Sequence, residues 1–202
     1  MTRYLRSVLF IAPLILMGSC TSLSTQSPKV VERSNRIRPK WVVNDFSGEA
    51  NGEVFLVHRK PKANLIELGI KQAEIEGITQ TKKLAIERVA LDLREKAQEI
   101  LKKNATESRV NFIANGAEAL LKNSSFAPSD AKPKQVYYER IEYTKQGRIK
   151  TYYDIFILLT IGEAEYLEGL NIALTGLRKA KDPLVRSFAA KYISTLKDKL
   201  GL

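Results

Sequence analysis

Few side chains in this sequence are suited to covalent catalysis. Cys20 is the single cysteine and His58 the single histidine of the 202 residues. A Ser–His–Asp or Cys–His arrangement needs a histidine base within reach of its nucleophile. Cys20 directly follows an apolar leader, whereas His58 ends an apolar run beside Arg59 and Lys60, so we interpret His58 as a surface or strand-edge residue. A zinc site built from cysteine and histidine is excluded by their number.

Carboxylates are the remaining groups that could supply an acid and a base. The candidates are Glu74, Glu76, Asp92, Glu95 and Glu99. The last three are spaced by three and four residues, and basic residues are interleaved with them: Arg88, Lys96 and Lys102. This spacing is typical of a solvent-facing helix surface with side-chain ion pairs. No glycine-rich phosphate loop is present. We therefore expect a protein that is not an enzyme and that uses no cofactor and no metal.

The segment before Cys20 indicates export and lipidation. Arg3 and Arg6 form a basic start, and the apolar run from Val8 to Met17 fits a secretory leader but is short for a membrane span. Met17-Gly18-Ser19-Cys20 resembles the lipobox of bacterial lipoproteins, in which cleavage occurs just before a diacylated cysteine. The thiolate is the nucleophile that a lipid transferase can alkylate. We expect a signal peptide over residues 1–19 and lipidation of Cys20; the alternative is an ordinary signal peptide that leaves a free cysteine.

The lipobox resemblance also implies a location. Two or three acyl chains anchor a protein durably to a membrane. Thr21 stands where an aspartate would signal retention in the inner membrane, so we expect a lipid anchor in the outer membrane and a domain that faces the periplasm. Residues 21–40 are rich in serine, threonine, proline and charge. With Cys20 they predict a flexible tether over residues 20–40.

The charge of the chain is strongly positive. The formal net charge is +11, and loss of Arg3 and Arg6 with the leader leaves +9. The most biased segment is C-terminal, and its basic residues are candidate partner-binding residues: Arg178, Lys179, Lys181, Arg186, Lys191, Lys197 and Lys199. Export excludes nucleic acid as their ligand. The segment is therefore either a solvated helix that aids solubility, or a helix that docks an acidic neighbouring subunit or anionic lipid headgroups.

Hydropathy patterns predict the elements that position these residues. Apolar, β-branched runs predict strands at residues 53–58 and 64–70, and a period of 3.6 residues predicts helices at 79–103 and 106–121. Residues 135–143 and 148–161 flank Lys145-Gln146-Gly147 and predict a hairpin. Its second strand is apolar on both faces, so we expect it at the centre of the sheet. Two closing helices are expected at 163–179 and 183–200, the latter with Asp182 as its N-cap.

Together these elements predict an α+β domain over residues 41–162 and a helical extension over residues 163–202. The expected order is ββ-α-α-ββ. It gives a small, mostly antiparallel sheet of about four strands with a long helix packed on it, followed by two C-terminal helices. Trp41 is the single tryptophan and stands at the entry to this domain. We expect its side chain to seal one end of the core.

Several features occur in a suggestive order after the lipobox. They are Pro39-x-Trp41, a strand ending in Glu67-Leu68-Gly69-Ile70, an alanine-rich helix around Ala85, Ala90, Arg94 and Ala97, and a late hairpin from Tyr137-Tyr138-Glu139 to Tyr152–Ile157. Residues 39–162 thereby resemble the LPP-twenty family of bacterial outer-membrane lipoproteins, which includes lipoproteins of flagellar basal disks and outer-membrane rings. The resemblance implies a compact sheet crossed by a long helix and a tendency to assemble. The segment Arg59–Lys62 and about forty residues after Ile161 depart from the family pattern.

Two functions follow from this sequence. The first is a structural or assembly lipoprotein that supports an envelope machine, flagellar or secretory, as a homo-oligomer or with other envelope proteins. The second is a periplasmic binding lipoprotein that regulates cell-wall synthesis or contacts peptidoglycan. A longer tether would favour the second function, because an activator of that kind needs reach. An enzyme acting on the cell wall is a distant third.

Overall fold

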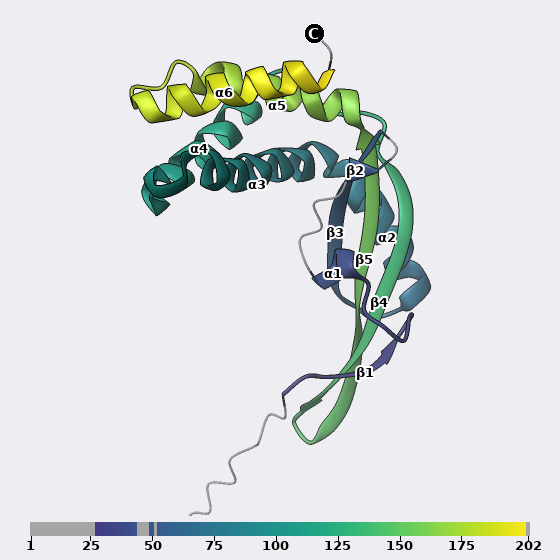
Figure 1. The fold of residues 1–202 in the computed structure, drawn as a ribbon. Coiled ribbons are helices and arrows are strands. Elements are labelled where there is room, and N and C mark those ends of the chain that lie inside the picture. Colours follow the sequence, from purple (N-terminus) through teal and green to yellow (C-terminus); the bar gives the residue numbers. More distant parts are fainter. Residues whose placement is uncertain (1–26, 44–48, 51, 201–202) are drawn as a thin grey trace, which may run out of the picture.

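A computed structural model describes residues 27–43, 49–50 and 52–200, with side chains for 27–43 and 52–197. Its centre is a five-stranded antiparallel sheet (Figure 1). The strands are β1 (Lys29–Arg33), β2 (Glu49–Ala50), β3 (Glu53–Ala63), β4 (Lys132–Lys145) and β5 (Arg148–Gly162), in the spatial order β1-β4-β5-β3-β2. The predicted α+β class with an antiparallel sheet is confirmed. The predicted signal peptide and Cys20 lie outside the described residues.

Strand β5 is central and is covered on both faces. Ile155, Ile157, Leu159 and Ile161 face the main core, while Phe156 and Leu158 are buried on the opposite face. The predicted hairpin joins β4 to β5 through Gln146 and Gly147, which have φ angles of 54° and 72°. Two successive left-handed residues are typical of the type I′ turn that suits twisted hairpins. Both predictions for this region, the hairpin and the central strand, are confirmed.

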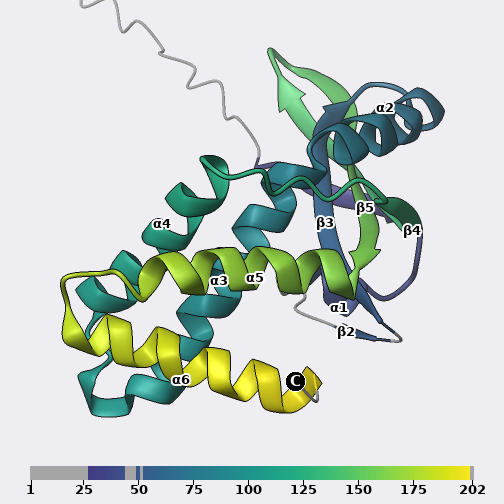
Figure 2. The ribbon, with the colours of Figure 1, turned by 90° about the horizontal axis from the view of Figure 1, so that it is seen from above.

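The helices gather at one end of the sheet, apart from α1 and α2. They are α1 (Lys40–Val43), α2 (Ile66–Thr79), α3 (Thr81–Leu101), α4 (Glu107–Lys122), α5 (Glu163–Leu177) and α6 (Pro183–Leu200). Helices α3 and α4 pack together, and α5 and α6 cover them (Figure 2). The predicted N-cap of α6 is confirmed, because the Asp182 carboxylate accepts a hydrogen bond from the backbone N–H of Leu184 at 2.8 Å. The apolar side of α6, including Val185 and Phe188, is buried in the main core.

The predicted strand at residues 64–70 is wrong, because α2 begins within this stretch, at Ile66. The apolar residues of this stretch fit the pattern of a strand as well as that of a helix, so the pattern alone could not distinguish the two. These residues are Leu65, Ile66, Leu68 and Ile70. The helical signal is the spacing of the small buried residues Gly69, Ala73 and Gly77. A Cβ atom at Gly69 would lie 2.5 Å from Ile155 Cδ1 and 2.7 Å from the Cβ of Ala63. Helix α2 therefore packs on the sheet at a distance that only a small residue permits there.

The long predicted helix at 79–103 is also shorter than expected. It begins at Thr81, after Gln80 has ended α2. The hydroxyls of Thr79 and Thr81 donate to the carbonyls of Ile75 and Ile78, each at 2.8 Å, so neither hydroxyl caps the N-terminus of α3, whose N-cap is Gln80. With α2 in place of a second strand, the ββ-α-α-ββ order is replaced by the order in Figure 1.

The predicted tether is wrong from Lys29 onward. Residues Lys29–Arg33 form β1, an edge strand that pairs with β4 from Lys29 opposite Glu142 to Arg33 opposite Glu139. Trp41 then lies on α1, with its side chain 8% exposed. It packs on Tyr137, Phe156 and Leu158 and so closes a second, smaller core on the face of the sheet away from the main one. Within the described part of the chain, no helix has the length and apolarity of a membrane span.

Candidate interaction surface

Helix α2 exposes large aliphatic side chains to solvent. Leu65, Leu68, Ile75 and Ile78 are 66%, 52%, 66% and 44% exposed, and we call them the α2 apolar face. Leu68, Ile75 and Ile78 lie on one side of α2, opposite the stripe of Gly69, Ala73 and Gly77 that touches the sheet, and Leu65 is the extended residue just before the helix. Contiguous exposed apolar patches mark interaction sites in soluble domains. The α2 apolar face is therefore the strongest candidate for a partner-binding surface among the described residues.

The spacing of the α2 apolar face is symmetric along the helix. Leu68 and Ile75 lie at equal distances in sequence from the midpoint between Lys71 and Gln72, and so do Leu65 and Ile78. Lys71 and Gln72 are themselves exposed. If α2 of a second copy packed antiparallel to α2 of the first, Leu68 of each copy would lie beside Ile75 of the other copy. A surface that is complementary to itself in this way is what a twofold-symmetric interface requires.

The basic residues of the C-terminal segment lie at the other end of the molecule from β1 (Figure 1). Arg178 ends α5, Lys179 and Lys181 lie in the following loop, and Arg186, Lys191 and Lys197 lie on α6; all six are exposed. The side chain of Lys199 lies outside the described residues. Arg186 donates hydrogen bonds to the carbonyls of Ala180 and Lys181 at 3.0 and 2.9 Å, so it also fixes the loop.

Two buried carboxylates form a charge cluster on the face of the sheet that carries Trp41. Glu139 on β4 lies directly opposite Asp154 on β5, and both are about 5% exposed. Glu139 Oε1 lies 3.3 Å from Arg33 Nε and 3.4 Å from Arg38 Nε, and it accepts a 2.9 Å hydrogen bond from the Tyr137 hydroxyl. Burial, together with that hydrogen bond, raises the pKa of Tyr137 to about 12. The phenol therefore remains a proton donor at neutral pH.

Asp154 is bound by residues of β3, the strand that lies on the other side of β5 from β4. Its carboxylate pairs with the Arg59 guanidinium and accepts a hydrogen bond from the backbone N–H of Lys62 at 3.1 Å. Arg38 and Arg59 also lie over the ring of Phe156, at 5.6 and 5.5 Å from its centroid. The attraction between each guanidinium and the aromatic ring further stabilises this cluster. The cluster thereby attaches the N-terminal segment to the sheet, a role that the sequence analysis did not identify.

His58 is buried rather than exposed at an edge, so its interpretation as a surface residue is wrong. It alternates with Val54 and Leu56 along β3, and all three face the main core side of the sheet. Its Nε2 lies 3.6 Å from Glu76 Oε2 of α2, while Glu76 Oε1 accepts a 2.5 Å hydrogen bond from Lys60 Nζ. Burial lowers the pKa of His58 below its ordinary 6.5, and the Glu76 carboxylate only partly opposes this shift. His58 is therefore neutral at physiological pH.

Two of the three predicted carboxylates of α3, Asp92 and Glu99, form ion pairs, as their spacing predicted. Arg88 Nε lies 2.9 Å from Asp92 Oδ2, and Lys96 Nζ lies 2.5 Å from Glu99 Oε2. Asp92, however, is mostly buried and also accepts a hydrogen bond from the Tyr166 hydroxyl of α5. Burial and the nearby Asp92 charge raise the pKa of Tyr166. This pair therefore joins α3 to α5 instead of facing solvent.

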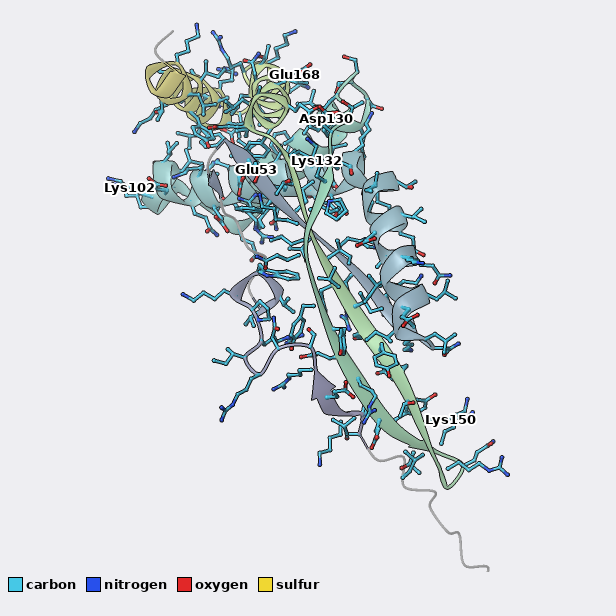
Figure 3. The ribbon with its side chains drawn as sticks, turned by 90° about the vertical axis from the view of Figure 1, so that its right-hand side faces the viewer. Glu53, Lys102, Asp130, Lys132, Lys150 and Glu168 are labelled. Atoms are coloured by element: carbon cyan, nitrogen blue, oxygen red, sulfur yellow. The ribbon has the colours of Figure 1, made fainter. Side chains whose placement is uncertain are left out.

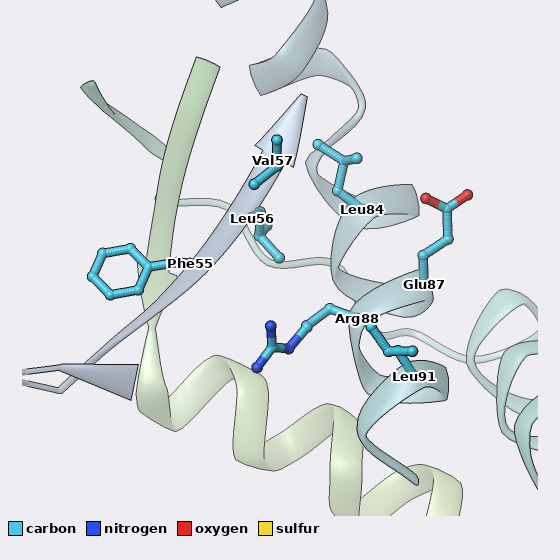
Figure 4. A pocket seen from close by; sticks show the side chains of 7 residues that line it. All are labelled: Phe55, Leu56, Val57, Leu84, Glu87, Arg88 and Leu91. Atoms are coloured by element: carbon cyan, nitrogen blue, oxygen red, sulfur yellow. The ribbon is translucent and has the colours of Figure 1, made fainter. Parts of the chain in front are cut away.

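A shallow pocket beside Arg88 is lined mainly by apolar side chains of β3 and α3. It measures about 310 Å³, and Phe55, Leu56, Val57, Leu84 and Leu91 line it together with Glu87 and Arg88. The Glu87 carboxylate points away from the Arg88 guanidinium (Figure 4). In the part of the chain that the structure describes, no three histidine, cysteine or carboxylate residues are grouped to hold a metal ion.

Comparison of this chain with protein-family models, with curated proteins and with solved structures found no match.

Proposed function

We propose that this chain is a non-enzymatic lipoprotein of the bacterial outer membrane, anchored through Cys20 and facing the periplasm. In this proposal it is a structural or assembly component of an envelope machine, such as a flagellar ring or disk or a secretion-associated complex. The observation that carries the assembly role is the α2 apolar face, which exposes three large aliphatic side chains on a helix, and a fourth just before it, while the other side of the helix already contacts the sheet. The resemblance to the LPP-twenty lipoproteins supports the same role, although its segment 67–70 lies in a helix.

The partner that we propose for the α2 apolar face is a second copy of this chain. Antiparallel pairing about the midpoint between Lys71 and Gln72 would bury the Leu68 and Ile75 side chains of both copies. One helix face is smaller than the interfaces of about 1,200 to 2,000 Å² that hold stable dimers together. Anchoring compensates for this, because chains confined to one membrane surface meet at a raised effective concentration. We therefore expect strong assembly of the lipidated protein and weak assembly of the chain without lipid.

The small number of residues between the proposed anchor and the domain favours assembly over a regulator that reaches across the periplasm. Cys20 stands nine residues before Lys29, the first residue of β1. Nine residues extend to at most about 30 Å. This is less than half the reach that a tether over residues 20–40 would give. The alternative, a binding lipoprotein that contacts peptidoglycan or a cell-wall synthase, is correspondingly less favoured.

Two measurements on the full-length protein test the proposal. Labelling with radioactive palmitate should mark the wild-type chain and fail in Cys20→Ser, because that variant has no thiol to acylate. Native mass spectrometry of the detergent-solubilised, lipidated chain should show oligomers. These should be lost in Leu68→Lys/Ile75→Lys, which places lysines at the centre of the α2 apolar face. Phe112→Lys is the matched control, since Phe112 is 53% exposed on α4. Unlabelled wild-type protein would refute the anchor, and oligomers that survive the double substitution would refute the α2 interface.

A further inference from the structure

The sheet extends beyond its core as a narrow, basic ribbon. The last residue pair that joins β3 to β5 is Ala63 with Tyr153, so residues 141–152 of β4, β5 and their turn continue without β3 beside them. Along this stretch only β1 pairs with them within the described chain, with Lys29 opposite Glu142. Figure 3 shows Lys150 at this end of the molecule and Glu168 of α5 at the other end.

One face of this ribbon combines cations with tyrosines. The cross-strand pairs Lys145–Arg148, Tyr143–Lys150 and Ile141–Tyr152 alternate along β4 and β5 and share a face. Lys145, Arg148 and Lys150 are exposed, and no acidic side chain of the described residues forms an ion pair with them. The rings of Tyr143 and Tyr152 lie edge to face at 5.6 Å. We call these five residues, the three cations and the two tyrosines, the ribbon face. Ile149, on the reverse of the ribbon, is 74% exposed.

We propose that the ribbon face is a second membrane-contact site, which lies on the anionic phospholipid headgroups of the bilayer that holds the lipid anchor. This inference rests on the proposed function, since it assumes that Cys20 carries acyl chains. Cys20 is nine residues from Lys29, and Lys29 pairs with the ribbon. Nine residues extend to at most about 30 Å. The anchor therefore holds the ribbon, and not α5 or α6, next to the bilayer.

The chemistry of the ribbon face matches an anionic membrane surface. Lysine and arginine near such a surface are attracted by its negative potential, each by an amount that falls off within a Debye length. Tyrosine has an apolar ring and a polar hydroxyl, which suits the boundary between headgroups and acyl chains. Together with the acyl chains, this contact fixes the orientation of the domain and leaves the basic α6 end, at the other end of the molecule, away from the bilayer (Figure 1).

Fluorescence of the full-length, lipidated protein in vesicles tests the contact. Cys20 is the only native cysteine and its thiol is occupied by lipid in this proposal. Gln146→Cys, at an exposed position in the turn next to Lys145, therefore provides a single site for an environment-sensitive fluorophore. In vesicles of mixed phosphatidylglycerol and phosphatidylcholine its emission should shift to the blue. The shift should be lost in pure phosphatidylcholine, at high salt, and after the added substitutions Lys145→Glu, Arg148→Glu and Lys150→Glu. The same fluorophore at Lys179→Cys, in the loop between α5 and α6, should not shift.

Flotation of the same vesicles separates this inference from the proposed function. If the triple charge-reversal variant still floats with phosphatidylcholine vesicles but loses the blue shift, the anchor and the ribbon contact are both supported. If wild type floats but the fluorophore at residue 146 shows no shift in anionic vesicles, the ribbon inference is overturned while the anchor stands. If wild type fails to float with phosphatidylcholine vesicles, the anchor is refuted. An equal shift at residues 146 and 179, or one that survives charge reversal, would also overturn the ribbon inference.

Discussion

Glu139 and Asp154 face each other across β4 and β5, and each buried carboxylate is neutralised by arginines from a different part of the chain. Arg33 and Arg38 come from the N-terminal segment, whereas Arg59 comes from β3. Two adjacent carboxylates in a buried site repel each other unless cations accompany them. The N-terminal segment therefore docks where the sheet most needs positive charge. If the chain is anchored at Cys20, this cluster also determines how closely the domain is tied to the membrane.

Glu139→Ala is expected to release the N-terminal segment from the sheet. The free energy of unfolding should fall by about 1 to 3 kcal/mol, because the Tyr137 hydroxyl and two arginines lose their acceptor. Hydrogen exchange should accelerate in β1 and at Ser34, whose backbone N–H donates to the Tyr138 carbonyl. Glu142→Ala, on the same strand but only half-buried, is the control. Unchanged protection of β1 in Glu139→Ala would show that the strand docks without the cluster.

His58 should make the protein less stable in mild acid. Burial lowers the pKa of His58 in the folded state below 6.5, so the unfolded chain binds a proton more readily as the pH falls. The free energy of unfolding should therefore decrease as the pH drops through 6.5 toward the lowered pKa. Above pH 6.5 the full contribution of neutral His58 to this free energy should be present. Melting temperatures measured between about pH 5 and 8 test this expectation. The slope should flatten in His58→Asn, and an equally steep slope in that variant would assign the acid sensitivity to other groups.

Gly69→Ala is expected to destabilise the protein although alanine favours helices. The added methyl would lie 2.7 Å from the Cβ of Ala63, an atom that no side-chain rotation can move. Overpacking of this kind costs about 1 to 3 kcal/mol, more than the gain in helix propensity of roughly 1 kcal/mol. Gly116→Ala on α4 is the control, since its nearest neighbour is a leucine methyl at 3.2 Å. Equal stability of the two variants in chemical denaturation would contradict the close packing of α2.

Leu93→Asp should be the most disruptive of these substitutions. Leu93 lies on α3 with no exposed surface, and a buried carboxylate without a partner destabilises a fold by several kcal/mol. Gln98→Asp, on the exposed side of the same helix, is expected to change the melting temperature little. Thermal unfolding followed by circular dichroism compares them. A similar melting temperature for Leu93→Asp and wild type would mean that this stripe is not the core.

Periodicity predicted the elements whose side chains repeat without interruption. The hairpin of β4 and β5, helix α4 and helix α6 follow from their own residues, because each has a regular apolar face and a clear turn or cap. The burial of His58 was also within reach, since Val54, Leu56 and His58 alternate along one strand. Its neighbours Arg59 and Lys60 suggested the surface instead, and both are bound by carboxylates, those of Asp154 and Glu76.

Long-range contacts account for what the sequence did not predict. The segment Lys29–Arg33 is short, and it forms a strand by pairing with β4, where Arg33 and Arg38 contact Glu139, more than a hundred residues away. Helix α2 was missed because its inner side carries glycine and alanine while its large apolar residues face outward. This reversal of the usual burial pattern led to the wrong prediction of a strand. The same reversal marks α2 as a candidate interaction surface.

Cross-linking of Gln72→Cys in membranes tests the central claim, assembly through α2, most directly. Gln72 is exposed and adjoins the midpoint of the α2 apolar face, so in an antiparallel pair the two introduced thiols lie close together. A short bismaleimide should convert the lipidated variant largely to covalent dimers, and adding Leu68→Lys should abolish them. Gln98→Cys on α3 should remain monomeric under the same conditions. Dimers at residue 98 in equal yield, or their absence at residue 72, would contradict assembly through this helix.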